Sequence, residues 1–310
     1  MNWPSVGVVI PTRNRPELVR RAIAAVREQR YPGEIRIVVV YDQTEPDYLL
    51  ASTPAAASSE GVPVLVLTNW RASGLAGARN TGLLALDTEL VAFCDDDDRW
   101  LPDKLRRQVA ALLADPDAEF ATCAIEVEYE GHTTARLAGR SRVTVDDLAR
   151  SRMAMLHSSS FLIRRDSLVD GAVGLVAEDA PGSQNEDWDL LLRAARRAPI
   201  VHLDEPLVQV LWGRSSHYAY EYATKITSLR WMMRRHPEIS GCRPGAARVY
   251  GQLACWSAAT GDRSQAWQYS KEAVRANWRE PRTAIALAAM TGAVKVENVL
   301  SALHRRGRGI

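Results

Sequence analysis

Four consecutive aspartates, at positions 95–98, are the residues of this sequence with the clearest potential for chemistry. Neighbouring carboxylates repel one another, so leaving all four ionised without a partner costs free energy. A divalent cation removes that cost, and Mg²⁺ or Mn²⁺ is typically held by one or two carboxylates together with substrate phosphates. The alternative is a solvated acidic loop in which Asp98 begins the next helix. We favour a metal site, because the run follows the apolar stretch Leu90 to Cys94 and precedes Trp100 and the helix-opening Pro102.

Polar residues also follow three earlier apolar stretches, at 6–10, 35–40 and 62–67. In an open parallel sheet, ligands bind at the carboxyl ends of the strands. One polar strand end is routine, but four together, with both signs of charge, predict a charged ligand along that edge. The residues concerned are Pro11, Thr12, Arg13, Asn14 and Arg15 after the first stretch, Tyr41 and Asp42 after the second, and Thr68 and Asn69 after the third.

The elements that must position these residues alternate along the first hundred positions. The apolar stretches are rich in Val and Ile and are typical of strands buried on both faces. Helical patterns over 16–29 and 75–86 separate them, and this order predicts an α/β fold with a mostly parallel sheet and helices on both faces. Further on we expect a helix after Pro102, a strand at 120–130, an irregular segment at 131–156, short strands at 158–163, 200–203 and 207–212, and a helix at 188–197.

The pattern from about residue 218 onward is helical. Helices at 246–260 and 263–277, joined by Gly261-Asp262, resemble one tetratricopeptide-like hairpin, although one copy is weak evidence for a repeat array. We therefore expect a first domain at 1–217 and a helical C-terminal region at 218–310. Residues 271–310 hold eight Lys/Arg against three Asp/Glu, which is compatible with contact to an anionic membrane surface but more typical of a solvated helix face.

Bulk properties exclude several classes of protein. The net charge of +2 gives no reason to expect a nucleic-acid partner. The N-terminus lacks a signal-peptide pattern, no apolar run is long enough to span a bilayer, and the four distant cysteines form no CxxC pair, so we expect a cytoplasmic setting, free or peripheral to the membrane. The segment after the first strand is PTRNRP, which is not the GxGxxG of a dinucleotide-binding enzyme, and there is no Walker A motif.

Five motifs in order resemble the family 2 glycosyltransferases, which have the Rossmann-like GT-A fold. The resemblance covers roughly residues 5–217 and leaves out the helical C-terminal region. Two departures concern the second strand end, where Tyr41-Asp42-Gln43-Thr44 replaces the usual Asp-Asp-Gly-Ser, and Gly74, which comes later than usual. The matching segments are Val8 to Arg15, Val39 to Asp42, Asn69 to Gly82, Phe93 to Pro102 (the DXD segment) and Glu186 to Leu190.

The resemblance implies an inverting, metal-dependent glycosyltransferase that moves a sugar from a nucleoside diphosphate, most often UDP, to an acceptor hydroxyl. It implies Asp187 as the catalytic base and Asp97 as a ligand of Mn²⁺ or Mg²⁺, with His217 as a candidate to complete the metal shell. Candidate donor contacts are Pro11, Thr12, Arg13, Arg15, Asp42, Asn69, Arg79, Asp95 and Asp96, and candidate acceptor-side residues are Trp100, His157, Ser158 and Glu186.

These roles meet two chemical needs of such a transfer. The departing diphosphate gains negative charge, which a metal ion neutralises, and the attacking hydroxyl loses a proton, which a carboxylate can accept. Asp187 could instead be a helix cap, since a carboxylate is favourable at a helix start in any case. The acceptor stays open among glycans, lipid-linked glycans, peptides and small molecules, as does homo-oligomerisation. The alternatives are a nucleotide-sugar-binding protein without transfer activity and a scaffold built on the C-terminal helices.

Overall fold

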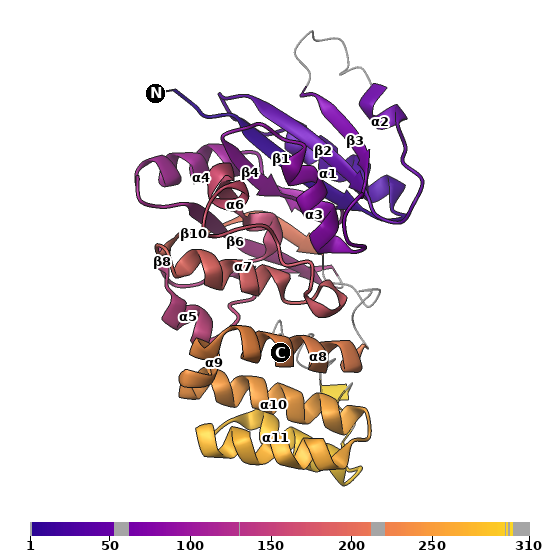
Figure 1. The fold of residues 1–310 in the computed structure, drawn as a ribbon, viewed down its shortest axis with the longest axis vertical. Coiled ribbons are helices and arrows are strands. Elements are labelled where there is room, and N and C mark those ends of the chain that lie inside the picture. Colours follow the sequence, from indigo (N-terminus) through magenta and orange to yellow (C-terminus); the bar gives the residue numbers. More distant parts are fainter. Residues whose placement is uncertain are drawn as a thin grey trace. The chain divides into compact units, whose positions relative to one another are not determined.

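The structure is a computed structural model that describes residues 2–52, 62–129, 131–211, 221–294, 296, 298 and 299 (Figure 1). By compactness the chain divides into two units. The first comprises Met1–Thr144, Met153–Glu178 and Arg193–Trp212, and the second comprises Val145–Arg152, Asp179–Leu192 and Gly213–Ile310. The division thus follows no single cut in the chain, and the predicted boundary near residue 218 stays a prediction.

The first unit is built on one sheet with the strand order β3-β2-β1-β4-β9-β6-β10-β5. The first four strands are parallel to one another, as predicted from the β-α-β order. β9 is antiparallel to both of its neighbours, β4 and β6, whereas β6 and β10 are parallel. The strands of the main path are β1 (Val6–Thr12), β2 (Ile35–Tyr41), β3 (Val64–Thr68), β4 (Leu90–Phe93), β5 (Arg99–Trp100), β6 (Phe120–Tyr129), β9 (Leu162–Arg164) and β10 (Ile200–Leu211).

Helices cover both faces of the sheet because β1 and β2 present apolar side chains on each side. Val8 packs in the core with Val19 of α1 and Val109 of α4. The opposite face receives α3, and a side chain on Gly82 would collide with Val9 there, so glycine allows this close approach. The helices of this unit are α1 (Pro16–Arg27), α2 (Leu49–Ser52), α3 (Leu75–Leu84), α4 (Lys104–Leu113) and α6 (Arg165–Val169).

The segment predicted to be irregular, 131–156, contains regular structure. β7 (His132–Arg136) forms a hairpin with β6, β8 (Arg142–Val143) pairs with β10, and α5 (Val145–Arg150) follows. The side chains of β7 are nearly all exposed, so the alternation that marks a half-buried strand is missing from its sequence.

Two predicted strand limits were also wrong. Residues 200–203 and 207–212 were predicted as separate strands, but β10 runs through both, with register shifts on either side of Pro206, which has no N–H to donate. Ser158–Ser160 form a 3₁₀ turn, η1, rather than the start of the strand predicted at 158–163, and β9 begins only at Leu162.

The second unit is helical. Figure 1 shows α8 (Tyr222–Arg235), α10 (Arg243–Ala259) and α11 (Arg263–Ala276) stacked one on the next. The predicted hairpin of α10 and α11 is confirmed, and its turn has Gly261 in the left-handed region at φ 81°. The unit also contains α5, η2 (Pro181–Ser183), the start of α7 (Glu186–Ala195), α9 (Pro237–Gly241) and α12 (Pro281–Met290).

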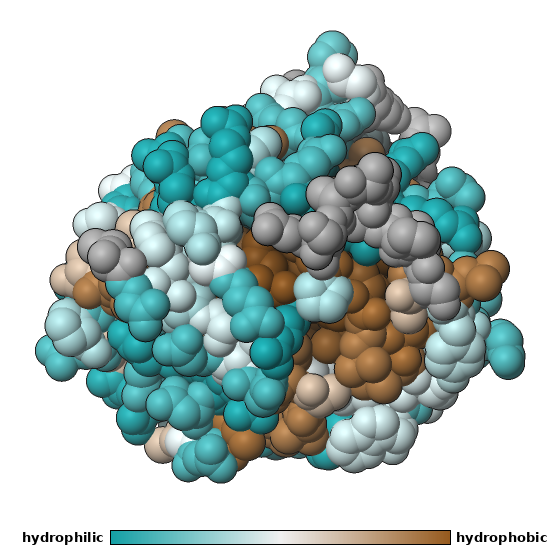
Figure 2. Space-filling model, turned by 90° about the horizontal axis from the view of Figure 1, so that it is seen from above, coloured by the Kyte–Doolittle hydropathy of each residue, from teal (hydrophilic) through white to brown (hydrophobic). Residues whose placement is uncertain are grey.

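In the view from above, hydrophilic residues cover much of the surface, and the largest of several hydrophobic areas lies near the centre (Figure 2). Within the described residues, Tyr48, Leu49 and Leu65 are large apolar side chains exposed on or beside α2 and β3. No helix within the part of the chain that the structure describes is long and apolar enough to cross a bilayer.

Candidate active site

The acidic loop, residues 95–98, follows β4 at the carboxyl edge of the parallel strands. β1 lies between β2 and β4 in the sheet, so Thr12, Asp42 and Asp95 end neighbouring strands at the same edge. The loop is closed by a turn in which the Asp98 N–H donates to the Asp95 carbonyl at 3.1 Å. The sequence prediction that strand-end polar residues gather along one edge therefore agrees with the sheet order.

The loop is held on one side by residues that follow β1. The Thr12 hydroxyl donates to Asp96 Oδ2 at 2.7 Å, and Arg15 Nη1 donates to Asp96 Oδ1 at 3.0 Å and to Asp97 Oδ2 at 2.9 Å. Burial raises the pKa of Asp96, although the bonds from Thr12 and Arg15 oppose that shift. Thr12 and Arg15 therefore fix the acidic loop before any ligand arrives.

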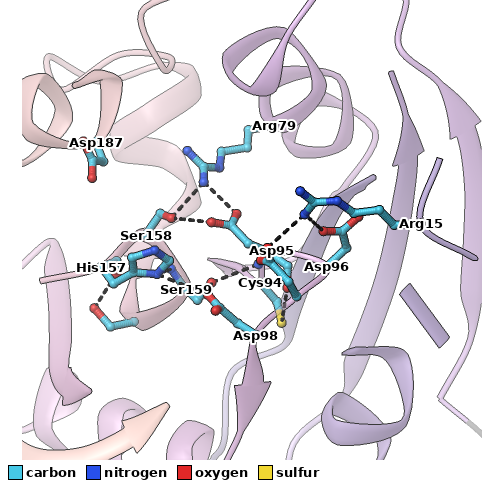
Figure 3. Close-up of polar contacts among 12 residues, drawn as sticks. Arg15, Arg79, Cys94, Asp95, Asp96, Asp98, His157, Ser158, Ser159 and Asp187 are labelled. Carbon is cyan, nitrogen blue, oxygen red and sulfur yellow. Dashed lines mark hydrogen bonds and ion pairs between the residues drawn. The ribbon is translucent and has the colours of Figure 1, made fainter. Parts of the chain in front are cut away.

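Arg79 reaches the loop from α3 on the other side (Figure 3). Its Nη2 donates to Asp95 Oδ1 at 2.7 Å and to the Ser158 hydroxyl at 2.8 Å, and Ser158 donates to Asp95 Oδ2 at 2.9 Å. Burial acts to raise the pKa of Asp95, but the charges of Arg79 and His157 outweigh it, so the pKa is lowered. Asp95 is consequently held as an ionised carboxylate beside a buried guanidinium.

Asp98 turns toward the 3₁₀ turn that precedes β9. Its Oδ2 accepts a hydrogen bond from the Ser159 hydroxyl at 2.5 Å and lies 3.2 Å from His157 Nδ1. The Ser159 hydroxyl in turn accepts a bond from the Asp95 N–H at 2.9 Å, so the 3₁₀ turn and the acidic loop are joined. Asp95, Asp98 and His157 offer ligand atoms within 4.8 Å of one another, which is compact enough for a cation.

Asp97 differs from the other three aspartates because its side chain is 36% exposed. Burial, followed by the charges of Asp98, Asp95 and Asp96, raises its pKa to about 6. Carboxylate oxygens are the ligands that Mg²⁺ and Mn²⁺ prefer. A cation at Asp97 would relieve the repulsion between its carboxylate and those of the other three aspartates. The residues present therefore fit a divalent cation, either at Asp97 or among Asp95, Asp98 and His157.

Asp42, at the end of β2, is buried and organises the start of α3. Both of its carboxylate oxygens accept from the Gly74 N–H at 3.1 Å, and Oδ1 accepts from Asn69 Nδ2 at 2.7 Å. Asn69 also accepts from the Thr81 hydroxyl at 2.9 Å. Asp42 and Asn69, which were predicted to contact the nucleotide-sugar donor, thus also have a structural role at the N-terminus of α3, the helix that carries Arg79.

The remaining predicted residues of this unit are spread over different environments. Pro11 is buried at the end of β1, whereas Arg13 is exposed. Trp100 is 1% exposed and belongs to the core, where the Lys104 ammonium lies 3.7 Å from the centre of its ring. The ring packs in the core, and the acceptor-side role of Trp100 stays a prediction. His217 lies outside the described residues.

Glu186 and Asp187 begin α7 in the second unit, and both are buried. Arg152 Nη2 donates to Asp187 Oδ2 at 2.8 Å and to Oδ1 at 3.1 Å, and the Trp188 N–H donates to Oδ1 at 2.7 Å. Asp187 thus sits in the first turn of a helix, as predicted, with a guanidinium on its carboxylate. A helix start favours a negative side chain in addition.

The model of Glycosyl transferase family 2 matches residues 7–171, which is more than half of the chain. The chain belongs to glycosyltransferase family 2. The solved structures it resembles include S. aureus TarS 1–349 in complex with UDP-GlcNAc (TM-score 0.59, 15% identity, 98% of this chain and 92% of that chain). The mannosyltransferase PcManGT from Pyrobaculum calidifontis, in complex with GDP-Man and Mn²⁺, gives a TM-score of 0.55 at 17% identity, over 94% of this chain and 87% of that chain. The GT-A fold expected for family 2 is confirmed.

Among curated proteins, this family 2 chain is 31% identical over 108 residues to the UDP-Glc:alpha-D-GlcNAc-diphosphoundecaprenol beta-1,3-glucosyltransferase WfgD of Escherichia coli. The match covers 35% of this chain and 41% of that relative. The chain therefore spans less than half of the length of this curated relative.

Sequence reasoning missed three residues that shape the site. Ser159 and Asp98 bridge the acidic loop to η1, and Arg152 is paired with Asp187. Asp98 was already conspicuous as the last of four aspartates. Ser159 and Arg152 had no local signal, because each meets a partner 35 or more positions away in the chain.

Proposed function

We propose that this protein is an inverting glycosyltransferase that moves a sugar from a nucleoside-diphosphate sugar to a hydroxyl of a lipid-linked acceptor. The observation that carries the proposal is the arrangement at the carboxyl edge of β1, β2 and β4, where Arg15 and Arg79 bracket the acidic loop. The printed activity of the Escherichia coli relative, which uses UDP-Glc and a diphosphoundecaprenol-linked acceptor, supports this choice of donor and acceptor class.

The donor diphosphate is the group that these residues suit. Arg15 and Arg79 supply planar guanidinium groups, which bind phosphate oxygens in pairs. We assign the nucleoside to the side of Asp42 and Asn69 and the ribose to Asp95, following the family pattern. UDP is the base we favour, because the Escherichia coli relative and the TarS complex both name a UDP sugar.

Asp97 is the residue that we expect to hold Mn²⁺ or Mg²⁺, since Asp98 is already bonded to Ser159 and paired with His157. When bound there, the metal supplies a Lewis acid that neutralises charge on the departing diphosphate. Arg15, which bonds both Asp96 and Asp97, holds the two carboxylates in place for it. The Mn²⁺ in the PcManGT complex supports a divalent cation in a protein of the same fold.

Asp187 is the residue that we propose as the base. A base must be ionised to accept the proton of the acceptor hydroxyl, and the guanidinium of Arg152 favours the ionised carboxylate. The bond from the Trp188 N–H fixes the orientation of Oδ1. With Asp187 as a base, the acceptor oxygen attacks the anomeric carbon directly, on the face opposite the departing diphosphate. No covalent sugar–enzyme intermediate is needed, and this single displacement inverts the anomeric configuration.

The replacement Asp187→Asn tests the proposal, with a UDP sugar, Mn²⁺ and a polyprenyl-diphosphate-linked sugar as substrates. Asn keeps the shape and caps a helix about as well as Asp, but it cannot accept the proton. We expect kcat to fall by roughly 10²-fold or more while donor affinity and folding are kept, which is the usual scale for a general base. Asp166→Asn, at an exposed position in the first turn of α6, is the matched control and should retain full turnover.

Near-normal turnover of a folded Asp187→Asn protein would move the base elsewhere, with Glu186 as the next candidate. Donor binding without transfer to any acceptor, in a protein with both carboxylates intact, would favour a nucleotide-sugar-binding protein instead.

A further inference from the structure

The helix that carries Asp187 is tied to the C-terminal helices by a buried ionic cluster. Asp189, two residues further along α7, is fully buried. Its Oδ1 accepts from Arg235 Nε at 2.6 Å and lies 2.9 Å from Nε2 of His236, which is also fully buried. Arg235 ends α8 and His236 precedes α9, so the side chains that contact Asp189 of α7 come from the junction of these two helices.

The turn that precedes α7 is tied to α8 as well. Asn185 Nδ2 donates to the Ser228 hydroxyl at 2.7 Å, and that hydroxyl donates to the Gln184 carbonyl at 2.6 Å. Trp231 Nε1 donates to Asp179 Oδ2 at 3.1 Å. Asn185 has a positive φ of 64°, a left-handed conformation that is uncommon outside glycine but that asparagine adopts more readily than most residues.

The geometry of an α-helix connects this cluster to Asp187. Residues two apart on a helix with 3.6 residues per turn point about 200° apart around the axis. Asp189 therefore anchors the side of α7 roughly opposite to Asp187. A buried carboxylate is costly unless charged donors meet it, so the cluster allows α7 little freedom to rotate or slide.

We infer that Asp189, His236 and Arg235 are positioning residues that set the direction of the Asp187 carboxylate. This inference rests on the proposed role of Asp187 as the base. It gives the C-terminal helices a part in the transfer step, since both partners of Asp189, Arg235 and His236, come from them. Donor binding should not depend on the cluster, because the donor residues proposed above belong to the other compact unit.

The test compares His236→Leu, which removes the donor to Asp189, with His236→Gln, which keeps a donor amide. We expect His236→Leu to lower kcat by about 10- to 100-fold, the scale of a catalytic group displaced by about 1 Å, while the donor Kd changes by less than about 2-fold. His236→Gln should recover most of the loss. A merely structural role would not produce this separation of kcat from donor affinity.

Two controls decide whether the effect passes through Asp187. Leu253→Ala, in the buried face of α10, loosens the same unit without touching the cluster. Equal loss of kcat in Leu253→Ala, at an equal loss of melting temperature, would overturn the inference. In an Asp187→Asn background, His236→Leu should cause little further loss of kcat, and a further full loss would also overturn it.

The failure of the inference can be told apart from the failure of the proposed function. A poor Asp187→Asn enzyme beside a normal His236→Leu enzyme overturns the inference alone. A normal Asp187→Asn enzyme removes the proposed base and the inference with it.

If His236→Leu does not fold, Arg235→Gln replaces it, because Arg235 is half-exposed and its loss leaves His236 on Asp189. The same loss of kcat at constant donor Kd is then expected, and an unchanged kcat overturns the inference.

Discussion

A single guanidinium nitrogen, Nη2 of Arg152, lies 2.8 Å from one carboxylate oxygen of Asp187 and 3.1 Å from the other. The charge of Asp187 raises the pKa of Arg152, although burial opposes the shift. The Arg152 side chain is half-exposed whereas that of Asp187 is 11% exposed, so the pair is open to solvent on the arginine side. The same pairing favours the ionised form of Asp187 but occupies both of its oxygens.

Arg152→Gln should therefore change the pH dependence of transfer. Without the positive charge the protonated carboxyl persists to higher pH, so the acid limb of kcat/KM should move upward. Because Arg152 is half-exposed, we expect a smaller displacement than the loss of a fully buried ion pair would cause. Initial rates from pH 5 to 9 measure it. An acid limb that stays in place would show that Asp187 is not the group that titrates.

Metal binding should depend on Asp97 more than on His157. We expect Asp97→Asn to abolish Mn²⁺ binding and transfer together, with EDTA reproducing the loss in the unchanged protein. His157→Gln should weaken Mn²⁺ binding by less than about tenfold, because Asp97 and substrate phosphates still supply oxygen ligands. Calorimetric titration with Mn²⁺ in the presence of UDP compares the two. The reverse order would place the cation among Asp95, Asp98 and His157.

Asp42→Asn probes whether the end of β2 contacts the donor base. Asn retains a carbonyl that can accept from Gly74 but loses the charge and one acceptor oxygen. We expect the donor KM to rise several-fold, by roughly 1 kcal/mol of lost binding, with a smaller change in kcat. A fall in melting temperature with an unchanged donor KM would reduce Asp42 to its structural role at Gly74.

Lys104 should make stability depend on pH. Burial lowers its pKa to about 8, and its ammonium has no hydrogen-bond acceptor among the residues that the structure describes. Because the unfolded chain binds this proton up to a higher pH, the free energy of unfolding should increase as pH rises from about 8 to 10. Below pH 8 the full cost of burying the charge is present, about 3 kcal/mol, and the Trp100 ring offsets part of it.

Lys104→Met should consequently stabilise the protein by about 1–2 kcal/mol at pH 7 and flatten the increase above pH 8. Urea unfolding at pH 7 and at pH 9.5 measures both effects. Lys271→Met, at an exposed position of α11, is the matched control and should change neither. A Lys104→Met protein that is less stable at pH 7 would show that the buried ammonium has a partner.

The parallel half of the sheet could be predicted because each of its strands is a short stretch of Val and Ile followed by polar residues. The same pattern predicted that Thr12, Asp42 and the acidic loop would share one edge. β7 could not be predicted, since its exposed side chains give no alternation, and Pro206 misled because a proline within a strand usually marks its end.

The location of the site could be predicted from the sequence, but the hydrogen-bond partners of its residues could not. Four consecutive aspartates indicated the location of the site. Nothing near Asp95 in the sequence, however, indicates that Arg79 donates to one of its oxygens and Ser158 to the other. Likewise, the sequence predicted that Asp187 begins a helix. The guanidinium that pairs with it belongs to Arg152, which lies in the segment predicted to be irregular. Such pairings are properties of tertiary packing and follow no local rule.

The position of β9 between β4 and β6 has a consequence for synthesis of the chain on the ribosome. β4 ends at Phe93, and its neighbour on that side is added only when residues 162–164 have emerged from the exit tunnel. Until then the edge of β4 is unpaired, and the four aspartates lack the serines and the histidine that precede β9. The nascent sheet therefore carries an open edge beside a strongly negative loop for about seventy residues of translation, several seconds at ordinary elongation rates. A chaperone that binds exposed strand edges would have its opportunity in that interval.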